Sequence, residues 1–235
     1  DLAEGYRSQD AAIRRWPDAI AGWKVGFIGP ERRDASGEDR VSGPIFARAV
    51  WPDRPGEVQD FPVFEGGFAA VEAEYVFRLG HDASPQQLSW SPDEARALVA
   101  ALHIGVELAG SPLATINELG PSVVASDFGN NAGLILGREI PDWERQPDAA
   151  LACSTWIDDA CVGRGGAHRI PGGLLGALAF ALGRCARRGF ALRAGMLVTT
   201  GAATGIHDIR RGQSARIEFG PWGEIRCHAV PATPC

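Results

Sequence analysis

The chain has 235 residues, a formal net charge of −6 and 45% hydrophobic residues, which is ordinary for a globular protein. These values argue against a nucleic-acid or anionic-membrane surface as the main binding partner, because binding to phosphates needs a basic face. The longest apolar run, residues 174–183, covers about half of a membrane span. The chain begins at Asp1 without Met, which leaves open a removed leader or further preceding residues.

The apolar pattern predicts a series of short helices and strands without regular alternation, which favours an α+β fold dominated by antiparallel or mixed sheet. Expected helices cover residues 1–16, 91–102 and 171–188. Expected strands cover residues 22–28, 43–50, 71–79, 103–109, 122–127, 132–136, 149–157, 160–162, 196–200, 214–219 and 224–229. We expect one catalytic domain over residues 1–235, with an N-terminal helical arm over residues 1–20.

Residues 29–40 form a polar segment that contains Gly and Pro. This composition is typical of a mobile loop, and such a loop can act as a lid that excludes water from a site. A disordered surface loop is an equally good interpretation of the same residues.

The five cysteines contain no CxxC motif, and their number is odd. A disulfide framework or a structural zinc site is therefore not expected, and a reducing, cytoplasmic location fits better. They are Cys153, Cys161, Cys185, Cys227 and Cys235.

The basic residues comprise 22 Arg and a single Lys, Lys24, out of 23. A bias of composition toward Arg explains this count on its own. Alternatively, Arg replaces Lys at solvated positions but not where an amine has to lose a proton.

The expected strand over residues 71–79 carries two acidic residues on one face. Side chains alternate across a strand, so Glu72 and Glu74 point the same way with Cα atoms about 7 Å apart. A buried face would need a divalent cation to compensate these charges, whereas an exposed face would leave them solvated. Glu107 lies in a second apolar run, where an unpaired carboxylate is unusual, and so predicts a third oxygen ligand.

Four segments in order resemble the fumarylacetoacetate hydrolase superfamily, and within it the branch of 2-keto-4-pentenoate hydratases and 4-oxalocrotonate decarboxylases. Residues 21–26 (AGWKVG) resemble its GWKVG motif, and residues 71–74 (VEAE) resemble its EAE metal strand. Glu107 followed by residues 127–137 (DFGNNAGLILG) resembles its third ligand and a DNxxSG-type loop. Residues 194–201 (AGMLVTTG) resemble its closing AGDxVLTG segment.

This resemblance implies a mixed β-sandwich or roll of the hydrolase C-terminal-domain type with a few flanking helices. It implies a cytoplasmic homo-oligomer, some residues ahead of Asp1, and no nucleic-acid or membrane partner. A complex with another enzyme of the same pathway is a further expectation. The implied substrate is a small unsaturated 2-keto acid, and the implied activity is a hydratase-type lyase reaction through an enolate stabilised by Mg²⁺ or Mn²⁺.

The resemblance also implies the roles of individual residues. The metal ligands are Glu72, Glu74 and Glu107, and the candidate catalytic groups are Lys24 and Asp127. The residues expected to bind the substrate are Asn130, Asn131, Thr200, Gly201 and Arg48. A plain turn over residues 127–131 is an alternative, because Asp, Gly and Asn all favour turns.

Two other reactions stay open. One is decarboxylation of an oxo-dioate, with Arg48 holding the second carboxylate. The other is acylpyruvate hydrolysis, which fits less well because no His lies between Lys24 and Glu72. Departures from the hydratase pattern motivate a third alternative from another class, a non-catalytic subunit that partners an active lyase. They lie at Ala47, Arg48, Asn130, Asn131 and Ala202.

Overall fold

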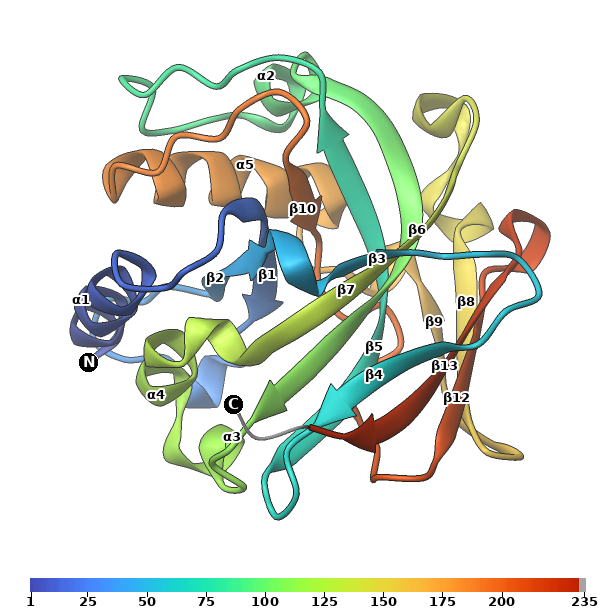
Figure 1. Ribbon diagram of the computed structural model, residues 1–235. Helices are drawn as coiled ribbons and strands as arrows, with labels where there is room; N and C mark the ends of the chain where they lie inside the picture. The colour runs from blue at the N-terminus through green and yellow to red at the C-terminus, as the bar shows by residue number, and fades with distance from the viewer. Residues whose placement is uncertain (233–235) are drawn as a thin grey trace.

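A computed structural model describes residues 1–232, and its strands form two sheets that pack face to face (Figure 1). The first sheet has eight strands in these residues. In spatial order its main path is β2 (Arg40–Phe46), β1 (Ile20–Phe27), β10 (Leu197–Thr199), β5 (Phe68–Leu79), β6 (Val99–Ser111), β7 (Asn131–Glu139) and β3 (Val50–Pro52), while β11 (His207–Asp208) pairs with β5 outside this path.

The second sheet has five strands, on the right of Figure 1. Their order is β4 (Gln59–Val63), β13 (Glu224–Pro231), β12 (Ser214–Glu218), β8 (Ala152–Ile157) and β9 (Ala160–Gly166). The main core lies between the sheets, where Tyr75 and Phe77 of β5 pack with Ile217 and Ile225 of the second sheet. Alternation along β5 then directs the intervening side chains to the other face of the first sheet.

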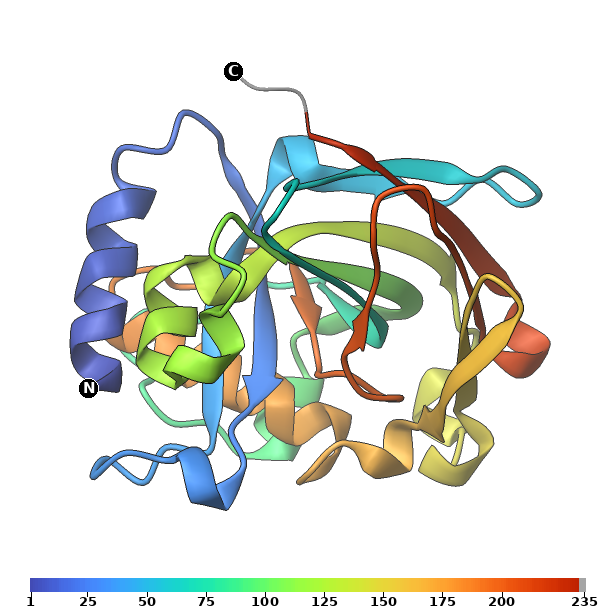
Figure 2. The ribbon, with the colours of Figure 1, turned by 90° about the horizontal axis from the view of Figure 1, so that it is seen from below.

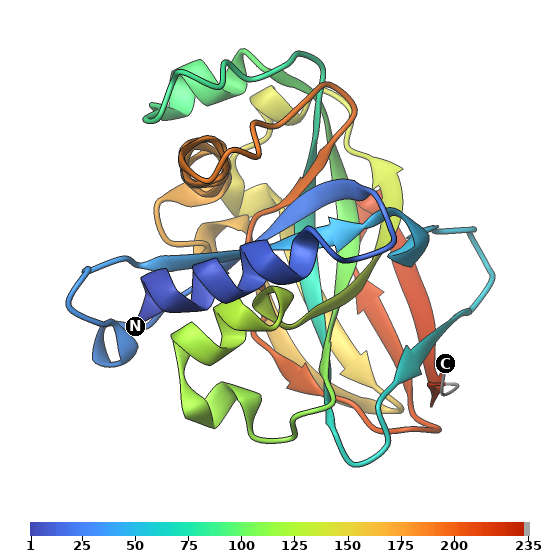
Figure 3. The ribbon, with the colours of Figure 1, turned by 60° about the vertical axis from the view of Figure 1, so that its left-hand side comes forward.

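The helices cover the first sheet at its β1–β2 end (Figures 2 and 3). Helix α5 (Gly173–Arg187) packs against β1, β2 and β10, with α2 (Pro92–Arg96) beside it. Helix α1 (Leu2–Ile13) packs against α4 (Pro121–Ser126), and α3 (Ile116–Leu119) precedes α4. Short 3₁₀ turns complete the chain at Pro30–Arg32, Ala47–Ala49, Phe128–Asn130, Trp143–Arg145, Asp148–Ala150, Ala167–Arg169 and Gly220–Trp222.

Most expected elements are present, and two expectations were wrong. Residues 122–126 lie in helix α4 rather than in a strand, and Asp127 is its C-cap, because Gly120 has a φ of 104° and Pro121 occupies the first helical turn. The helix expected over residues 91–102 ends at Arg96 despite its capping box at Ser91, since Val99 already pairs with β5. Pairing between distant strands overrides the local helical pattern there.

The α+β class and the mixed sheets agree with the expected fold. Within residues 1–232, no helix combines the length and the apolar character needed to span a membrane. Cys153, Cys161, Cys185 and Cys227 are free thiols, and Cys235 lies outside the described residues.

Candidate metal centre

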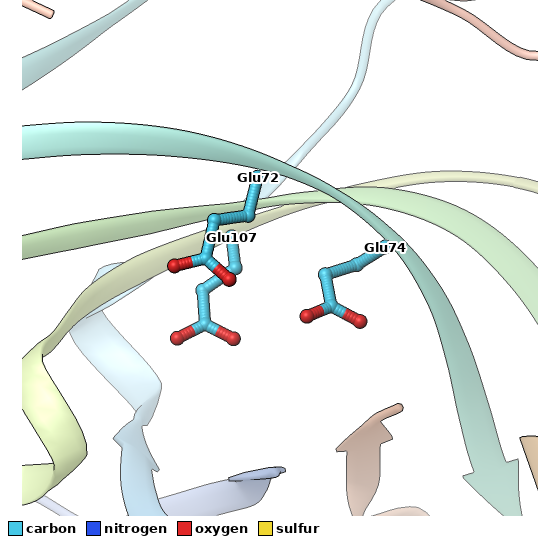
Figure 4. A group of neighbouring side chains, drawn as sticks. All are labelled: Glu72, Glu74 and Glu107. Atoms are coloured by element: carbon cyan, nitrogen blue, oxygen red, sulfur yellow. The ribbon is translucent and has the colours of Figure 1, made fainter. Parts of the chain in front are cut away.

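The three predicted acidic ligands meet on one face of two neighbouring strands. In the antiparallel pairing of β5 and β6, Glu72 lies directly opposite Glu107, and Glu74 lies two residues further along β5. Figure 4 shows the three carboxylates directed to the same side of these strands. Each glutamate offers an oxygen within 4.8 Å of the others, and none of the three is more than 4% exposed.

Neighbouring residues hold two of these carboxylates in place. The backbone N–H groups of Thr200 and Gly201 donate to Oε2 of Glu74 at 2.9 and 2.7 Å. The hydroxyl of Thr199 donates to Oε2 of Glu107 at 3.0 Å. Hydrogen bonds of this kind orient metal ligands in proteins.

Other carboxylate oxygens of the group are left without such a partner. Oε1 of Glu72 and Oε1 of Glu74 are buried and have no hydrogen-bond partner among the described residues. Buried acceptors without partners are costly, so a proton or a cation is needed beside them. Three carboxylates are the donor set that Mg²⁺ and Mn²⁺ prefer, and the arrangement therefore fits a divalent cation.

Lys24 of β1 lies beside the glutamates and is only 4% exposed. Its Nζ is 3.0 Å from Oε1 of Glu107, and it donates to Oδ1 of Asn130 at 3.4 Å. Strands β10 and β5 lie between β1 and β6 in the sheet, so the contact with Glu107 reaches across two intervening strands.

Burial and the neighbouring charges shift the pKa values of the glutamates and of Lys24. Burial raises the pKa of Glu72 to about 7, against the lowering effect of Lys24 and with a raising contribution from Glu107. The pKa of Glu74 is raised for the same main reason, burial. Burial by itself would lower the pKa of Lys24, but the nearby carboxylates, Glu107 above all, raise it above its ordinary value. A divalent cation on the carboxylates would act in the opposite direction on that amine.

The loop after α4 places Asn130 against Lys24. Phe128, Gly129 and Asn130 have φ values of 52°, 68° and 54°, three successive residues in the left-handed region. Gly43 of β2 permits the close approach of this loop, since a Cβ at that position would lie 1.8 Å from the carbonyl oxygen of Phe128.

A pocket of about 500 Å³ opens above the glutamates. Five of the predicted site residues line it: Lys24, Glu72, Asn130, Thr200 and Gly201. Glu74 and Glu107 do not line the pocket, but each is buried and has an oxygen within 4.8 Å of Glu72, which does. The 29–40 segment borders the same pocket through Gly29, Arg32 and Arg40, which is the position that a lid would occupy.

Besides Glu74 and Glu107, three predicted residues are not among those that line the pocket. Asp127 accepts a hydrogen bond from Ser111 at 2.6 Å and so anchors the loop. Asn131 donates to the carbonyl of Gly133 at 3.4 Å. The side chain of Arg48 is 78% exposed, with Nε 3.9 Å from Asp18, so the structure does not bring it to the pocket.

Several lining or supporting residues were not expected from the sequence. Arg32, Arg40, Arg169 and Asn117 line the pocket, and Thr199 supports Glu107. Thr199 lies in the closing segment that already pointed to Thr200, so a signal for it was present. No local pattern distinguishes the three arginines from the other 19 in the chain.

No protein-family model matches the sequence, and no curated protein matches it. Solved structures do resemble it. The structure is similar to 4-oxalocrotonate decarboxylase from Pseudomonas putida G7, solved with magnesium and adipate, at a TM-score of 0.77 and 20% identity over 98% of this chain and 86% of that chain.

Two hydrolases share the same architecture. Fumarylpyruvate hydrolase from Pseudomonas aeruginosa, solved with Mn²⁺ and pyruvate, has a TM-score of 0.65 and 20% identity over 92% of this chain and 91% of that chain. Maleylpyruvate hydrolase from Sphingobium sp. SYK-6, solved with manganese(II) and pyruvate, has a TM-score of 0.57 and 14% identity over 90% and 71%. The expected fold, that of the fumarylacetoacetate hydrolase superfamily, is therefore confirmed.

Proposed function

We propose that the chain is a divalent-cation-dependent lyase of the fumarylacetoacetate hydrolase superfamily, acting on a small unsaturated 2-keto acid. One observation carries the proposal. Three buried glutamates, with two oxygens that lack hydrogen-bond partners, converge beneath a pocket beside the only lysine of the chain. The similar structures solved with magnesium or manganese support the choice of cation.

A cation held by Glu72, Glu74 and Glu107 would supply Lewis-acid stabilisation of negative charge that develops on the oxygens of a 2-keto acid. The chain's own groups orient this site. The backbone N–H groups of Thr200 and Gly201 donate hydrogen bonds to Glu74. These two N–H groups are therefore not free to bind the substrate. Lys24, fixed between Glu107 and Asn130, presents an ammonium group at the pocket.

A specific observation also supports a substrate with a second carboxylate. Arg32, Arg40 and Arg169 line the pocket, and none of the ion pairs within residues 1–232 engages Arg169. Arginine binds carboxylates with good geometry, so Arg169 would hold the far end of a diacid, whereas Arg40 is already paired with Asp39. Decarboxylation of an oxo-dioate is therefore our second candidate, with Arg169 in the role first expected of Arg48. The adipate in the decarboxylase structure, itself a diacid, agrees with this reading.

The experiment that tests the proposal is a paired assay. The protein with Mg²⁺ or Mn²⁺ is incubated with 2-hydroxypenta-2,4-dienoate and with a 4-oxalocrotonate-like diacid. Formation of the water adduct 4-hydroxy-2-oxopentanoate without CO₂ release would identify hydration, because loss of the dienol absorbance alone also follows from ketonisation. CO₂ release from the diacid would identify decarboxylation. Release of pyruvate from an acylpyruvate would instead point to hydrolysis.

Metal analysis with Glu72→Ala, Glu74→Ala and Glu107→Ala distinguishes the enzyme from a non-catalytic subunit. We expect the parent protein to retain a divalent cation and each variant to lose it. If the parent protein binds no divalent cation, both lyase readings fail. For the diacid reading, Arg169→Ala should raise KM for the diacid about tenfold or more, while Arg54→Ala, a change at an exposed residue outside the pocket lining, should not.

We also propose a homo-oligomer that can associate with another enzyme of its pathway. The support is the resemblance alone, and light scattering after gel filtration would test it. The cytoplasmic location stays a prediction.

A further inference from the structure

Asn117 on α3 lies where the pocket, the 29–40 segment and the loop after α4 meet. Its backbone carbonyl accepts a hydrogen bond from the guanidinium of Arg32. Its side-chain Oδ1 accepts a hydrogen bond from Nδ2 of Asn130 at 3.2 Å. Asn117, Arg32 and Asn130 all line the same pocket. One residue thus contacts both the segment that borders the pocket and the amide that contacts Lys24.

The contact with Asn117 determines which end of the Asn130 amide faces the lysine. An asparagine amide has one acceptor oxygen and one donor NH₂ group. Because Nδ2 of Asn130 is used by Asn117, Oδ1 faces Nζ of Lys24 at 3.4 Å. The reversed amide would direct its NH₂ group at an ammonium, which has no acceptor.

The backbone conformation of the loop restricts the position from which the Asn130 side chain can reach Lys24. Phe128 and Asn130 are two of only four non-glycine residues with positive φ in the described part of the chain. Each such residue costs on the order of 1–3 kcal/mol and persists only where surrounding contacts hold it. A Cβ at Gly129 would lie 3.0 Å from Cδ of Lys24, so the loop lies directly against the lysine side chain. The loop therefore presents Asn130 to Lys24 from a fixed backbone.

We infer that Asn117 is a positioning residue, which orients the Asn130 amide and through it directs the Lys24 ammonium toward Glu107. Because Arg32 binds the backbone of the same residue, the position of the 29–40 segment and the orientation of Lys24 are coupled. The importance of Lys24 for turnover rests on the proposed function, whereas the contacts themselves do not.

The single lysine allows a direct test. In protein labelled with ¹³C and ¹⁵N only in lysine, the side-chain resonances come from Lys24 alone. We expect Asn117→Ala to shift or broaden the Lys24 Nζ and Cε signals, in the protein with and without Mg²⁺. Asn117→Asp keeps an acceptor for Asn130 and should retain one ordered Lys24 signal. Glu118→Ala, an exposed change on the same helix, should leave the signal of the parent protein unchanged.

The coupling to the segment is tested with Arg32→Met, for which we expect a change of the Lys24 signal in the same direction as for Asn117→Ala. Arg54→Met, outside the pocket lining, is the matched control and should have no effect. In turnover assays, loss of orientation should lower kcat about tenfold with little change in KM, and Asn117→Asp should recover most of it.

The remaining outcomes would overturn the inference. An unchanged Lys24 signal in Asn117→Ala removes the positioning role, and so does failure of Asn117→Asp to preserve the signal. Equal changes in Asn117→Ala and Glu118→Ala would show a general disturbance of α3 instead. An unchanged signal in Arg32→Met would remove the coupling. Since these signals need no turnover, they separate this inference from a failure of the proposed function.

Discussion

Replacing Glu72 by Gln should make the cation-free protein more stable at alkaline pH, although it damages the cation site. Glu72 is 4% exposed, and its carboxylate lies beside Glu74 and Glu107 with one lysine to compensate all three. The neutral amide of Gln is close in shape to the carboxyl group and removes a buried negative charge. Without a cation, the charge at this position therefore costs more than it contributes.

The pKa of Glu72 sets the magnitude and the pH window. Its folded-state value is about 7, against an ordinary value of 4.5. Between these two values the folded protein binds more protons than the unfolded chain, so stability falls as pH rises through the window. At 1.36 kcal/mol per pKa unit, the cost at pH 8 is about 3 kcal/mol. Glu72→Gln should recover up to this amount at pH 8 and nothing below about pH 4.5, where the carboxyl group is neutral in both states.

Urea denaturation of EDTA-treated protein at several pH values from 4.5 to 8 measures this difference. Mg²⁺ at about 1,000 times its Kd should then reverse the order at pH 8, because a ligand at that concentration stabilises the folded parent protein by about 4.1 kcal/mol. The variant, which lacks one ligand, should gain much less. Glu118→Gln, an exposed carboxylate, is the control and should show neither effect. The reasoning is refuted if Glu72→Gln destabilises the cation-free protein equally at pH 5 and pH 8.

Three further changes should have separate effects. Lys24→Arg keeps the charge but not the compact amine, and we expect turnover to fall by about 10²-fold or more, measured in the paired substrate assay. Thr199→Val removes the hydroxyl that donates to Glu107 and should weaken Mg²⁺ or Mn²⁺ binding about 10- to 100-fold in calorimetry. Gly43→Ala places a Cβ 1.8 Å from the carbonyl oxygen of Phe128, so it should displace the loop and lower the urea midpoint.

Each of these three predictions has an outcome that would contradict it. If Lys24→Arg keeps full turnover, the composition bias toward Arg is enough to explain the single lysine. Unchanged cation affinity in Thr199→Val would show that the hydrogen bond from Thr199 to Glu107 does not contribute to cation binding. For Gly43→Ala the matched control is Gly176→Ala in α5, where no atom lies within 4 Å of the new Cβ and stability should be unchanged or slightly raised.

Several features of the site followed from local patterns in the sequence. The alternation of side chains along a strand was enough to predict that Glu72 and Glu74 share a face. The start of the helix expected from residue 91 was correct, and the structure shows a capping box of Ser91 and Glu94 there, whose two partners lie within one turn. The count of lysines singled out Lys24 before any contact was known. The first two depend on neighbours in the chain, and the third depends on composition alone.

The assembly of the site depended on pairing between distant segments. The register of β5 and β6 places Glu107 opposite Glu72, and a shift by one residue would turn Glu107 to the other face. The strand order places Lys24 within 3.0 Å of Glu107, leaves Arg48 outside the pocket and brings Arg169 to its lining. Local alternation thus determined that Glu72 and Glu74 point the same way. Which groups meet was decided by long-range register and strand order, since the chemistry needs side chains from β1, β5 and β6 within a few ångströms.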